Sequence, residues 1–339
     1  DRLRSRGLGD VYKRQVVETG CRYLRIVCFS YPAVALTYLL SNVLRGTERV
    51  RLPLYVSIVT TIANAFADYG LIFGAFGLPE LGVQGAAIAT FISQLVGGVL
   101  PVFYFIDRSN SSRLHLCKTS FYSKVLRDAC INGSSELMTN LSMSLVNILY
   151  NFQLLRLAGE NGVAAYGVIM YAAFLFVAVF VGYAVGSAPI VSFHYGARNH
   201  AEVHNLYRKS LRLIAVVAVT LTLASMFIIP CVARIFVGYD AELLALTSRA
   251  FRLYALSFLI MGFNVYASSF FTALGDGVTS ALISFLRTLA FQVIAILLLP
   301  LLLGIDGIWL AVTAAELAAL AVSAAMLLTK DKVFHYRKA

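Results

Sequence analysis

The sequence predicts an all-α polytopic membrane protein, and three observations support this fold class. Hydrophobic residues make up 59% of the 339 residues and charged residues only 13%, whereas soluble domains have about 45–50% and about 25%. The mean hydropathy is +0.78. Several apolar runs are long enough to cross a hydrocarbon core about 30 Å thick, which takes about 20 helical residues. The net charge of +11 comes from basic residues between these runs, so it reflects membrane topology and does not indicate a nucleic-acid partner.

We expect nine membrane-spanning helices, at residues 26–44, 53–76, 81–106, 135–157, 162–192, 211–236, 249–273, 279–303 and 307–329. The Lys and Arg residues are distributed unequally between the two sides of these spans. Seventeen, Arg287 among them, fall on the side of the loop at 45–52 and of the carboxyl terminus, and six fall on the other side. Because basic loops stay in the cytoplasm, we expect this loop and the carboxyl terminus to be cytoplasmic.

The first fifteen residues differ from the rest of the chain. Residues 1–15 hold five basic and two acidic residues, show no apolar periodicity and do not begin with Met. They resemble translated linker sequence, so we leave them out of the fold prediction. A basic targeting peptide is the alternative.

The apolar run at residues 52–77 contains an acidic residue, Asp68, with Asn64 one helical turn before it. An ionised Asp inside the bilayer costs roughly 2.5–3.5 kcal/mol on insertion scales, so such a side chain rarely faces lipid. The i, i+4 spacing places Asn64 and Asp68 on one helix face, where they could share a proton, a cation or a polar cavity. The alternative is a single hydrogen bond that holds two helices together.

Two further acidic residues lie inside predicted spans. Glu136 is followed by Asn140, Asn147 and Asn151, which form one polar stripe that is expected to line a cavity or to hold neighbouring helices. Glu316 lies mid-span and could serve a function or pair with a neighbouring helix. Aromatic side chains nearby could wall a cavity for flat organic cations, although each could instead be a packing residue; they are Tyr150, Phe152, Tyr166, Tyr171, Phe174 and Phe176.

Cofactor and enzyme motifs are not found in the sequence. The five cysteines have no paired spacing, and the five histidines fall in loops or in the carboxyl-terminal tail, so we expect no disulfide, metal centre or haem. We also find no P-loop, no HExxH motif and no Ser/His/Asp arrangement. We therefore expect a protein that is not an enzyme and does not hydrolyse ATP.

An internal repeat relates the first three spans to the last three. The repeat is supported by three pairs of matching motifs. Arg22-x-x-Arg25 matches Arg249-x-x-Arg252, and Gly46 matches Gly275. The third pair is Leu81-Gly82-x-x-Gly85-x-x-x-Ala89 and Leu303-Gly304-x-x-Gly307-x-x-x-Ala311. An offset of six spans keeps the two copies in the same orientation, and parallel repeats of this kind are a transporter architecture.

The repeat predicts a twelve-helix protein with two lobes of six helices, of which this chain contains nine helices. We expect a partial amino-terminal lobe, an inter-lobe linker in the cytoplasm, a complete carboxyl-terminal lobe and a cytoplasmic tail, at residues 16–107, 108–130, 131–329 and 330–339.

The order and spacing of several motifs resemble those of the MATE (multidrug and toxic compound extrusion) family, in its bacterial drug-efflux branch. The resemblance covers residues 21–329. Its motifs are Asn64-x-x-x-Asp68, LGVQGAAIAT at 81–90, the segment from GSSE at 133–136 to Tyr150-Asn151, and the segment from APIVS at 188–192 to Tyr195-Gly196-Ala197. The first two are similar to the family's fifth and sixth helices, and the last two to its seventh and eighth.

The resemblance implies a cation site in the amino-terminal lobe, formed by Asn42, Asn64, Asp68 and Thr90. The family's carboxylate on the first helix has no counterpart here. In the carboxyl-terminal lobe, Glu136 is similar to a coupling-ion carboxylate of some members. Its usual acidic partner on the tenth helix is replaced by an amide, with Asn264 nearest, which argues against a sodium site there.

We therefore expect a secondary active antiporter of the cytoplasmic membrane that exports cationic amphiphilic or toxic organic compounds in exchange for protons or sodium ions. Its expected partners are membrane lipids and small organic cations, and it is expected to be a monomer. Asp68 would be the coupling acid, and Glu136 with Asn140, Asn147, Tyr150, Asn151, Asn264 and Glu316 would bind substrate or ion. The alternatives are a lipid-linked sugar flippase of similar architecture and an intramembrane enzyme. A flippase would be expected to carry several basic residues deep in its spans, and only Arg287 comes near.

Overall fold

The computed structural model describes residues 17–46, 51–107 and 120–336, and these ranges are helical with no strand. The predicted leader at 1–15 and most of the predicted linker lie outside the described residues. The chain divides into two compact units, Asp1–Ser120 and Phe121–Ala339, and each unit is considered by itself. Their boundary falls inside the segment predicted as a linker, although residues from Ser123 onward already belong to a long helix.

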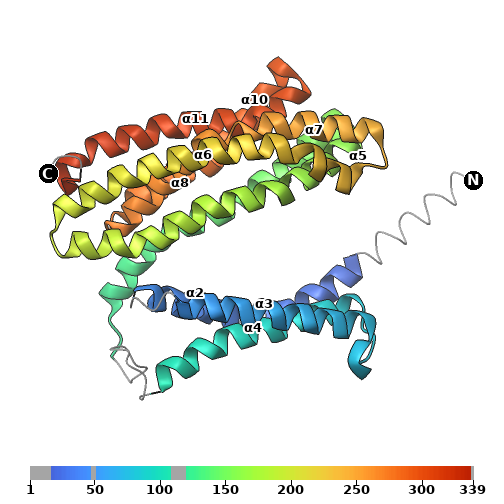
Figure 1. The fold of residues 1–339 in the computed structure, drawn as a ribbon, viewed down its shortest axis with the longest axis horizontal. Coiled ribbons are helices and arrows are strands. Elements are labelled where there is room, and N and C mark those ends of the chain that lie inside the picture. Colours follow the sequence, from blue (N-terminus) through green and yellow to red (C-terminus); the bar gives the residue numbers. More distant parts are fainter. Residues whose placement is uncertain (1–16, 47–50, 108–119, 337–339) are drawn as a thin grey trace, which may run out of the picture. The chain divides into compact units, whose positions relative to one another are not determined.

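The first unit is built from three spans. A helix over Val17–Cys28 and α2 (Tyr31–Gly46) form a pair that is bent by 47°. Helix α3 (Arg51–Phe73) leads through a short helix, η1 (Ala75–Gly77), to α4 (Val83–Ile106), which packs against both α2 and α3 (Figure 1).

The second unit begins with the longest helix, α5 (Ser123–Gly196), which is interrupted at Gly159, where φ is 62°. Helix α6 (His200–Val237) follows, and α7 (Ala241–Ala255) and α8 (Phe258–Ala273) form a second pair bent by 47°. The remaining elements are α9 (Gly277–Phe285), the π-helical segment η2 (Leu286–Ala290), α10 (Phe291–Leu303), α11 (Ile305–Thr329) and α12 (Asp331–Phe334). Helix α8 packs against α5, α6, α9 and α11 (Figure 1).

The predicted fold class is confirmed by these elements. Among the described residues, six helices are long and apolar enough to cross a membrane, and the two bent pairs raise this number to eight. The interruption at Gly159 divides α5 into two segments that match the predicted spans at 135–157 and 162–192. Each of the nine predicted spans therefore lies on a helix or on a helix pair.

The internal repeat is visible in the backbone of both units. The two bent pairs are the first helices of the two copies, and both are bent by the same 47°. Gly82 and Gly304 both have positive φ, at 52° and 59°, which glycine adopts without steric cost. A Cβ atom at Gly85 would collide with the carbonyl oxygen of Leu71. The equivalent glycine of the second copy, Gly307, makes the same close approach to the helix before it. The matched motif therefore makes the same tight helix-helix turn twice.

Part of the predicted tail packs on the second unit. Tyr336 is fully buried, and its hydroxyl donates a hydrogen bond to the carbonyl oxygen of Leu327 at 2.6 Å. Its own carbonyl oxygen lies 2.9 Å from Nδ1 of His204 on α6. Nearby, Lys330 forms an ion pair of 2.9 Å with Asp276, the residue that caps the start of α9. These contacts join one end of α6, α9 and α11.

Candidate functional site

A cavity of about 470 Å³ lies among the helices of the second unit. Its walls come from α5, α7, α8, α11 and the span that runs from α9 through η2 to α10. A volume of this size is typical of sites that bind drug-sized molecules, about 300–1,000 Å³. The side chains that line the cavity form three groups, which are a polar stripe on α5, an aromatic wall, and a buried ion pair with hydroxyl side chains beside it.

The polar stripe contains Glu136, Asn140 and Asn147, which all line the cavity. Asn140 donates a hydrogen bond of 2.8 Å to the backbone carbonyl of Glu136, so its amide is held on the helix. Asn151 donates to Asn147, at 2.8 Å to the backbone oxygen and 2.9 Å to the side-chain oxygen. Within the described part of the chain, the carboxylate of Glu136 has no hydrogen-bond or ion-pair partner. It is therefore the acidic group in the cavity that is free to bind a ligand.

The aromatic wall is formed by Tyr150 and Tyr166, which come from the two segments of α5 on either side of its interruption. Their rings are stacked, with centroids 5.0 Å apart and planes inclined by 12°. The hydroxyl of Tyr150 donates to the backbone oxygen of Ile308 on α11 at 3.4 Å. The rings are thus fixed in position, and both line the cavity.

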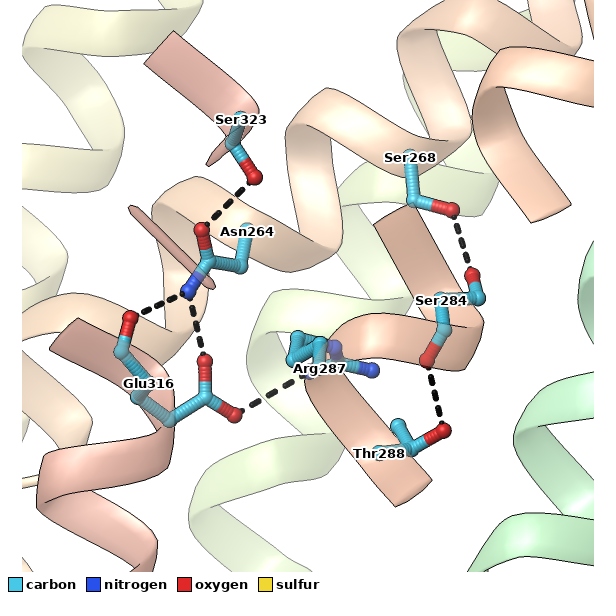
Figure 2. Close-up of polar contacts among 7 residues, drawn as sticks. All are labelled: Asn264, Ser268, Ser284, Arg287, Thr288, Glu316 and Ser323. Atoms are coloured by element: carbon cyan, nitrogen blue, oxygen red, sulfur yellow. Dashed lines mark hydrogen bonds and ion pairs between the residues drawn. The ribbon is translucent and has the colours of Figure 1, made fainter. Parts of the chain in front are cut away.

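A buried ion pair joins η2 to α11 (Figure 2). Nη1 of Arg287 lies 3.3 Å from Oε1 of Glu316, whose side chain is only 1% exposed. Asn264 on α8 donates to Oε2 of Glu316 at 2.7 Å and to its backbone oxygen at 2.9 Å, and Asn264 accepts a hydrogen bond of 2.9 Å from Ser323. Four polar side chains from three spans therefore form one connected network in the interior.

The ion pair is bound through a single nitrogen of the guanidinium. The Nε atom of Arg287 is buried and has no hydrogen-bond partner among the described residues. Arginine holds a carboxylate most firmly through two parallel hydrogen bonds, so this arrangement is weaker than the bidentate one. Arg287 lies in the π-helical segment, and such segments are rare and frequent at functional sites.

Hydroxyl side chains connect α8 with α9 beside the ion pair. The oxygen of Ser268 lies 2.9 Å from that of Ser280 and 2.8 Å from that of Ser284, and Thr272 donates to Ser280 at 2.7 Å (Figure 2 shows the contact of Ser268 with Ser284). Ser268, Ser284 and Thr288 also line the cavity. In a membrane interior these contacts satisfy groups that would otherwise be costly to bury, and they hold the two helices together.

The structure brings most of the predicted carboxyl-terminal residues together. Glu136, Asn140, Asn147, Tyr150 and Glu316 all line the one cavity. Asn264 lies behind Glu316 and binds it, so the amide at the predicted tenth-helix position is a partner of Glu316. Asn151 lies one turn beyond Asn147 and binds it. Of the two readings left open for Glu316, the pairing with a neighbouring helix is observed.

Arg287 was not among the predicted site residues, although the sequence already shows it as the basic residue that comes nearest to the depth of the spans. Arg287 was counted among the cytoplasmic basic residues, but it lies inside the span Gly277–Leu303, so that assignment was wrong. The excess of basic residues on the predicted cytoplasmic side remains without it. The sequence signal for Arg287 is its position inside an apolar run that also holds the polar residues Thr288 and Gln292. Both of these residues line the cavity as well.

The four residues predicted as an amino-terminal cation site lie on α2, α3 and α4 of the first unit. Asp68 and Asn64 are both partly buried on α3. Asn42 is exposed and accepts a hydrogen bond of 2.9 Å from Arg45, and Thr90 donates to the backbone oxygen of Ala86 on its own helix at 3.0 Å. No hydrogen bond joins the four among the described residues, so the cation site they would form stays a prediction.

The comparisons with known proteins agree with this architecture. The family model MatE matches residues 11–69 and 137–298. The chain is 25% identical to a probable multidrug resistance protein NorM of Thermotoga maritima over 306 aligned residues. The alignment covers 88% of this chain and 64% of that protein. It is 21% identical to the multidrug export protein MepA of Staphylococcus saprophyticus, over 92% of this chain and 67% of that protein. The chain thus spans about two thirds of the length of these relatives.

Solved structures show the same fold. One is described as the outward-facing conformation of a multidrug resistance MATE family transporter of the MOP superfamily, with a TM-score of 0.84 and 22% identity over 94% of this chain and 70% of that one. Another is a MATE protein in complex with MaL6, with a TM-score of 0.84 and 21% identity over the same shares. Because the family model matches well over half of its residues, the chain belongs to the MATE family.

Proposed function

We propose that this chain acts as a secondary active antiporter, which exports cationic amphiphilic compounds across the cytoplasmic membrane in exchange for protons or sodium ions. One observation carries the proposal, which is a cavity among membrane helices that combines an unpaired carboxylate, Glu136, with a stacked aromatic wall. The names of the relatives NorM and MepA, a multidrug resistance protein and a multidrug export protein, support the substrate class.

The charges of the cavity suit a monovalent organic cation. Arg287 and Glu316 cancel each other, so the single negative charge of Glu136 remains. Glu136 is exposed at the cavity wall, and its charge attracts a cation that enters the cavity. The rings of Tyr150 and Tyr166 cover each other and are only 2% and 6% exposed, so they add dispersion contacts at the cavity wall for a flat aromatic cation. Both residues keep their place through packing, which lowers the ordering cost of binding.

The same charges argue against the alternative function of a lipid-linked sugar flippase. Such a protein would need basic groups in the cavity to bind anionic phosphates. Arg287 is the single basic side chain among the described residues that line the cavity, and Glu316 already neutralises it. A phosphate would have to compete with this carboxylate and would also meet the charge of Glu136.

Asp68 is proposed as the coupling acid of the first unit, with Asn42, Asn64 and Thr90 in support. A proton and a cation compete for a carboxylate. Protonation removes the negative charge that attracts the cation, and a bound cation favours the ionised form. Loss of the charge would change which helix packing is favoured and so shift the balance between outward-open and inward-open states. Transport measured separately under a proton gradient and under a sodium gradient distinguishes the two candidate coupling ions.

The test is transport by the purified chain in proteoliposomes with an imposed proton or sodium gradient. Uptake of ethidium, a flat monovalent cation, is followed by fluorescence. We expect gradient-driven uptake that Glu136→Gln reduces at least tenfold, since the substitution removes the unpaired charge. The matched control is Glu160→Gln, an exposed acid on the same helix outside the cavity. Equal uptake by wild type and Glu136→Gln would reject the cavity as the cation site.

A further inference from the structure

The Arg287–Glu316 pair contains one partner that can change its charge and one that cannot. A buried glutamate can take up a proton, whereas arginine stays charged throughout the range of pH that proteins tolerate. The other titratable groups that line the cavity are Glu136, Tyr150, Tyr166 and Tyr254. Tyrosine ordinarily loses its proton only near pH 10, so the group of the pair that can take up a proton is the carboxylate of Glu316.

The hydrogen bonds around Glu316 treat its two protonation states differently. Asn264 donates to Oε2, and a neutral carboxylic acid can still accept this hydrogen bond, although more weakly than a carboxylate does. Ser323 donates to the side-chain oxygen of Asn264, which fixes the amide with its NH₂ toward Glu316. The contact of Arg287 with Oε1 depends on the negative charge. Protonation at Oε1 would therefore leave Glu316 in place and end the ion pair.

We propose that Glu316 and Arg287 couple proton uptake to the release of a cation from this cavity. The inference rests on the proposed function, because it requires that the cavity binds a cation. With Glu316 ionised, the charges of Glu136, Arg287 and Glu316 sum to −1 and the cavity attracts a cation. When Glu316 takes up a proton, the sum becomes zero and the positive charge of Arg287 is no longer compensated. The freed guanidinium then opposes the bound cation.

The size of the effect depends on the distance between the bound cation and the guanidinium. Glu136 and Tyr150 both line the cavity and lie 14 positions apart on α5, so the cavity is elongated, about 20 Å along this helix. We consider a cation bound beside the ion pair, about 10 Å from the guanidinium. At this separation and an effective dielectric constant of about 20, one uncompensated charge changes the affinity for a cation on the order of tenfold. By linkage, a bound cation lowers the proton affinity of Glu316 by the same factor.

The ion pair is held by a single contact, which makes proton uptake by Glu316 easier. Arg287 holds Glu316 through one nitrogen at 3.3 Å, and its buried Nε has no partner among the described residues. A bidentate pair would oppose proton uptake more strongly. Neither residue belongs to the proposed amino-terminal coupling site, so the second unit would carry a coupling element of its own.

The experiment measures binding of tetraphenylphosphonium, a permanently charged cation, to the purified chain in detergent at pH 8 and pH 5.5. Triphenylphosphine oxide, a neutral molecule of similar shape, serves as the reference ligand. We expect the cation to bind on the order of tenfold more weakly at pH 5.5, and the neutral molecule to show no such change. If neither wild type nor any variant binds the cation at either pH, the proposed function fails before the coupling is tested.

Variants separate Glu316 from Glu136, the other carboxylate that lines the cavity. Glu316→Gln imitates the protonated state and is expected to weaken cation binding at pH 8 on the order of tenfold. In the double variant Arg287→Gln with Glu316→Gln, the ion pair is absent. The ratio of the dissociation constants for the cation at pH 5.5 and at pH 8 is therefore expected to be smaller than in wild type, and any remaining pH dependence is assigned to Glu136. The double variant Arg249→Gln with Asp306→Asn removes an exposed ion pair between α7 and α11 and is the matched control.

Two results would overturn the inference. One is a cation-binding wild type whose ratio of dissociation constants is unchanged in the double variant. The other is Glu316→Gln protein that binds the cation at pH 8 as tightly as wild type. If Glu316→Gln does not fold, the exchanged pair Arg287→Glu with Glu316→Arg keeps both charges and should restore folding and the pH dependence; a restored fold without pH dependence would count against the proposal.

Discussion

The two partners of the buried ion pair should differ in what their removal costs. Glu316→Leu leaves Arg287 with a charge that it cannot lose, in a site where its side chain is only 11% exposed. Removing one partner of a buried pair typically costs about 3–5 kcal/mol of unfolding free energy. Arg287→Leu leaves a glutamate that can take up a proton and become neutral, so we expect a smaller cost of about 1–3 kcal/mol, the desolvation penalty of a neutral polar group.

The double variant Arg287→Leu with Glu316→Leu should cost less than either single variant. Both charges are then absent, although Asn264 loses one of its acceptors. Replacing a buried pair by apolar residues is often close to neutral. Because the double variant costs less than either single variant, the interaction energy in a double-mutant cycle should be at least as large as the greater single cost, about 3–5 kcal/mol.

The assay is equilibrium unfolding in mixed micelles with increasing fractions of SDS, followed by the loss of helical circular dichroism. The four proteins of the cycle are measured at pH 7.5, and the exposed pair Arg249 and Asp306 gives the reference cycle, with an expected interaction of about 0–1 kcal/mol. Equal costs for Glu316→Leu and Arg287→Leu, with an interaction no larger than that of the exposed pair, would show that the buried-pair reasoning is wrong.

Three further outcomes are expected. Gly85→Ala and Gly307→Ala should each destabilise the chain by about 1–3 kcal/mol in the same unfolding assay, because the added Cβ meets backbone atoms of the preceding helix; Gly133→Ala, with open space around it, is the control. Burial alone would raise the pKa of Asp276, but hydrogen bonds from Lys330 and Thr279 outweigh it and hold the pKa below its ordinary value of 3.8. The ionised form thus stabilises the fold above the ordinary pKa, and this contribution is lost as the pH falls through the lowered pKa, so Asp276→Asn should narrow the stability difference between pH 6 and pH 3. Asp68→Asn should abolish gradient-driven ethidium transport while leaving expression unchanged, and retained transport would remove Asp68 from the mechanism.

The spans and the repeat could be predicted because both depend on local patterns. Apolar runs about 20 residues long indicate membrane helices directly. The matched glycines report a backbone requirement, since positive φ at Gly82 and Gly304 and close approach at Gly85 and Gly307 demand a residue without a side chain. The interruption of α5 also falls at a glycine, Gly159, between two predicted spans.

The pairing inside the carboxyl-terminal cavity could not be predicted from such patterns. Arg287 and Glu316 are 29 positions apart, and Glu316 and Asn264 are 52 apart, so their contacts depend on how three helices pack. The topology count assigned Arg287 to the cytoplasmic side, although it lies within the predicted span 279–303. Tyr336 shows the same limit, because a tail residue became a fully buried contact of α6 and α11 through tertiary packing.

The most direct test of the account is the release of protons when a cation binds. Tetraphenylphosphonium is added to the purified chain in weakly buffered detergent solution at several pH values between 5.5 and 8, and the liberated protons are counted with a pH indicator. Because the coupling is on the order of tenfold, we predict release of up to about half a proton per bound cation near the midpoint of the titration, and a smaller release in Arg287→Gln with Glu316→Gln. Saturating cation binding without proton release at any pH in this range would contradict it.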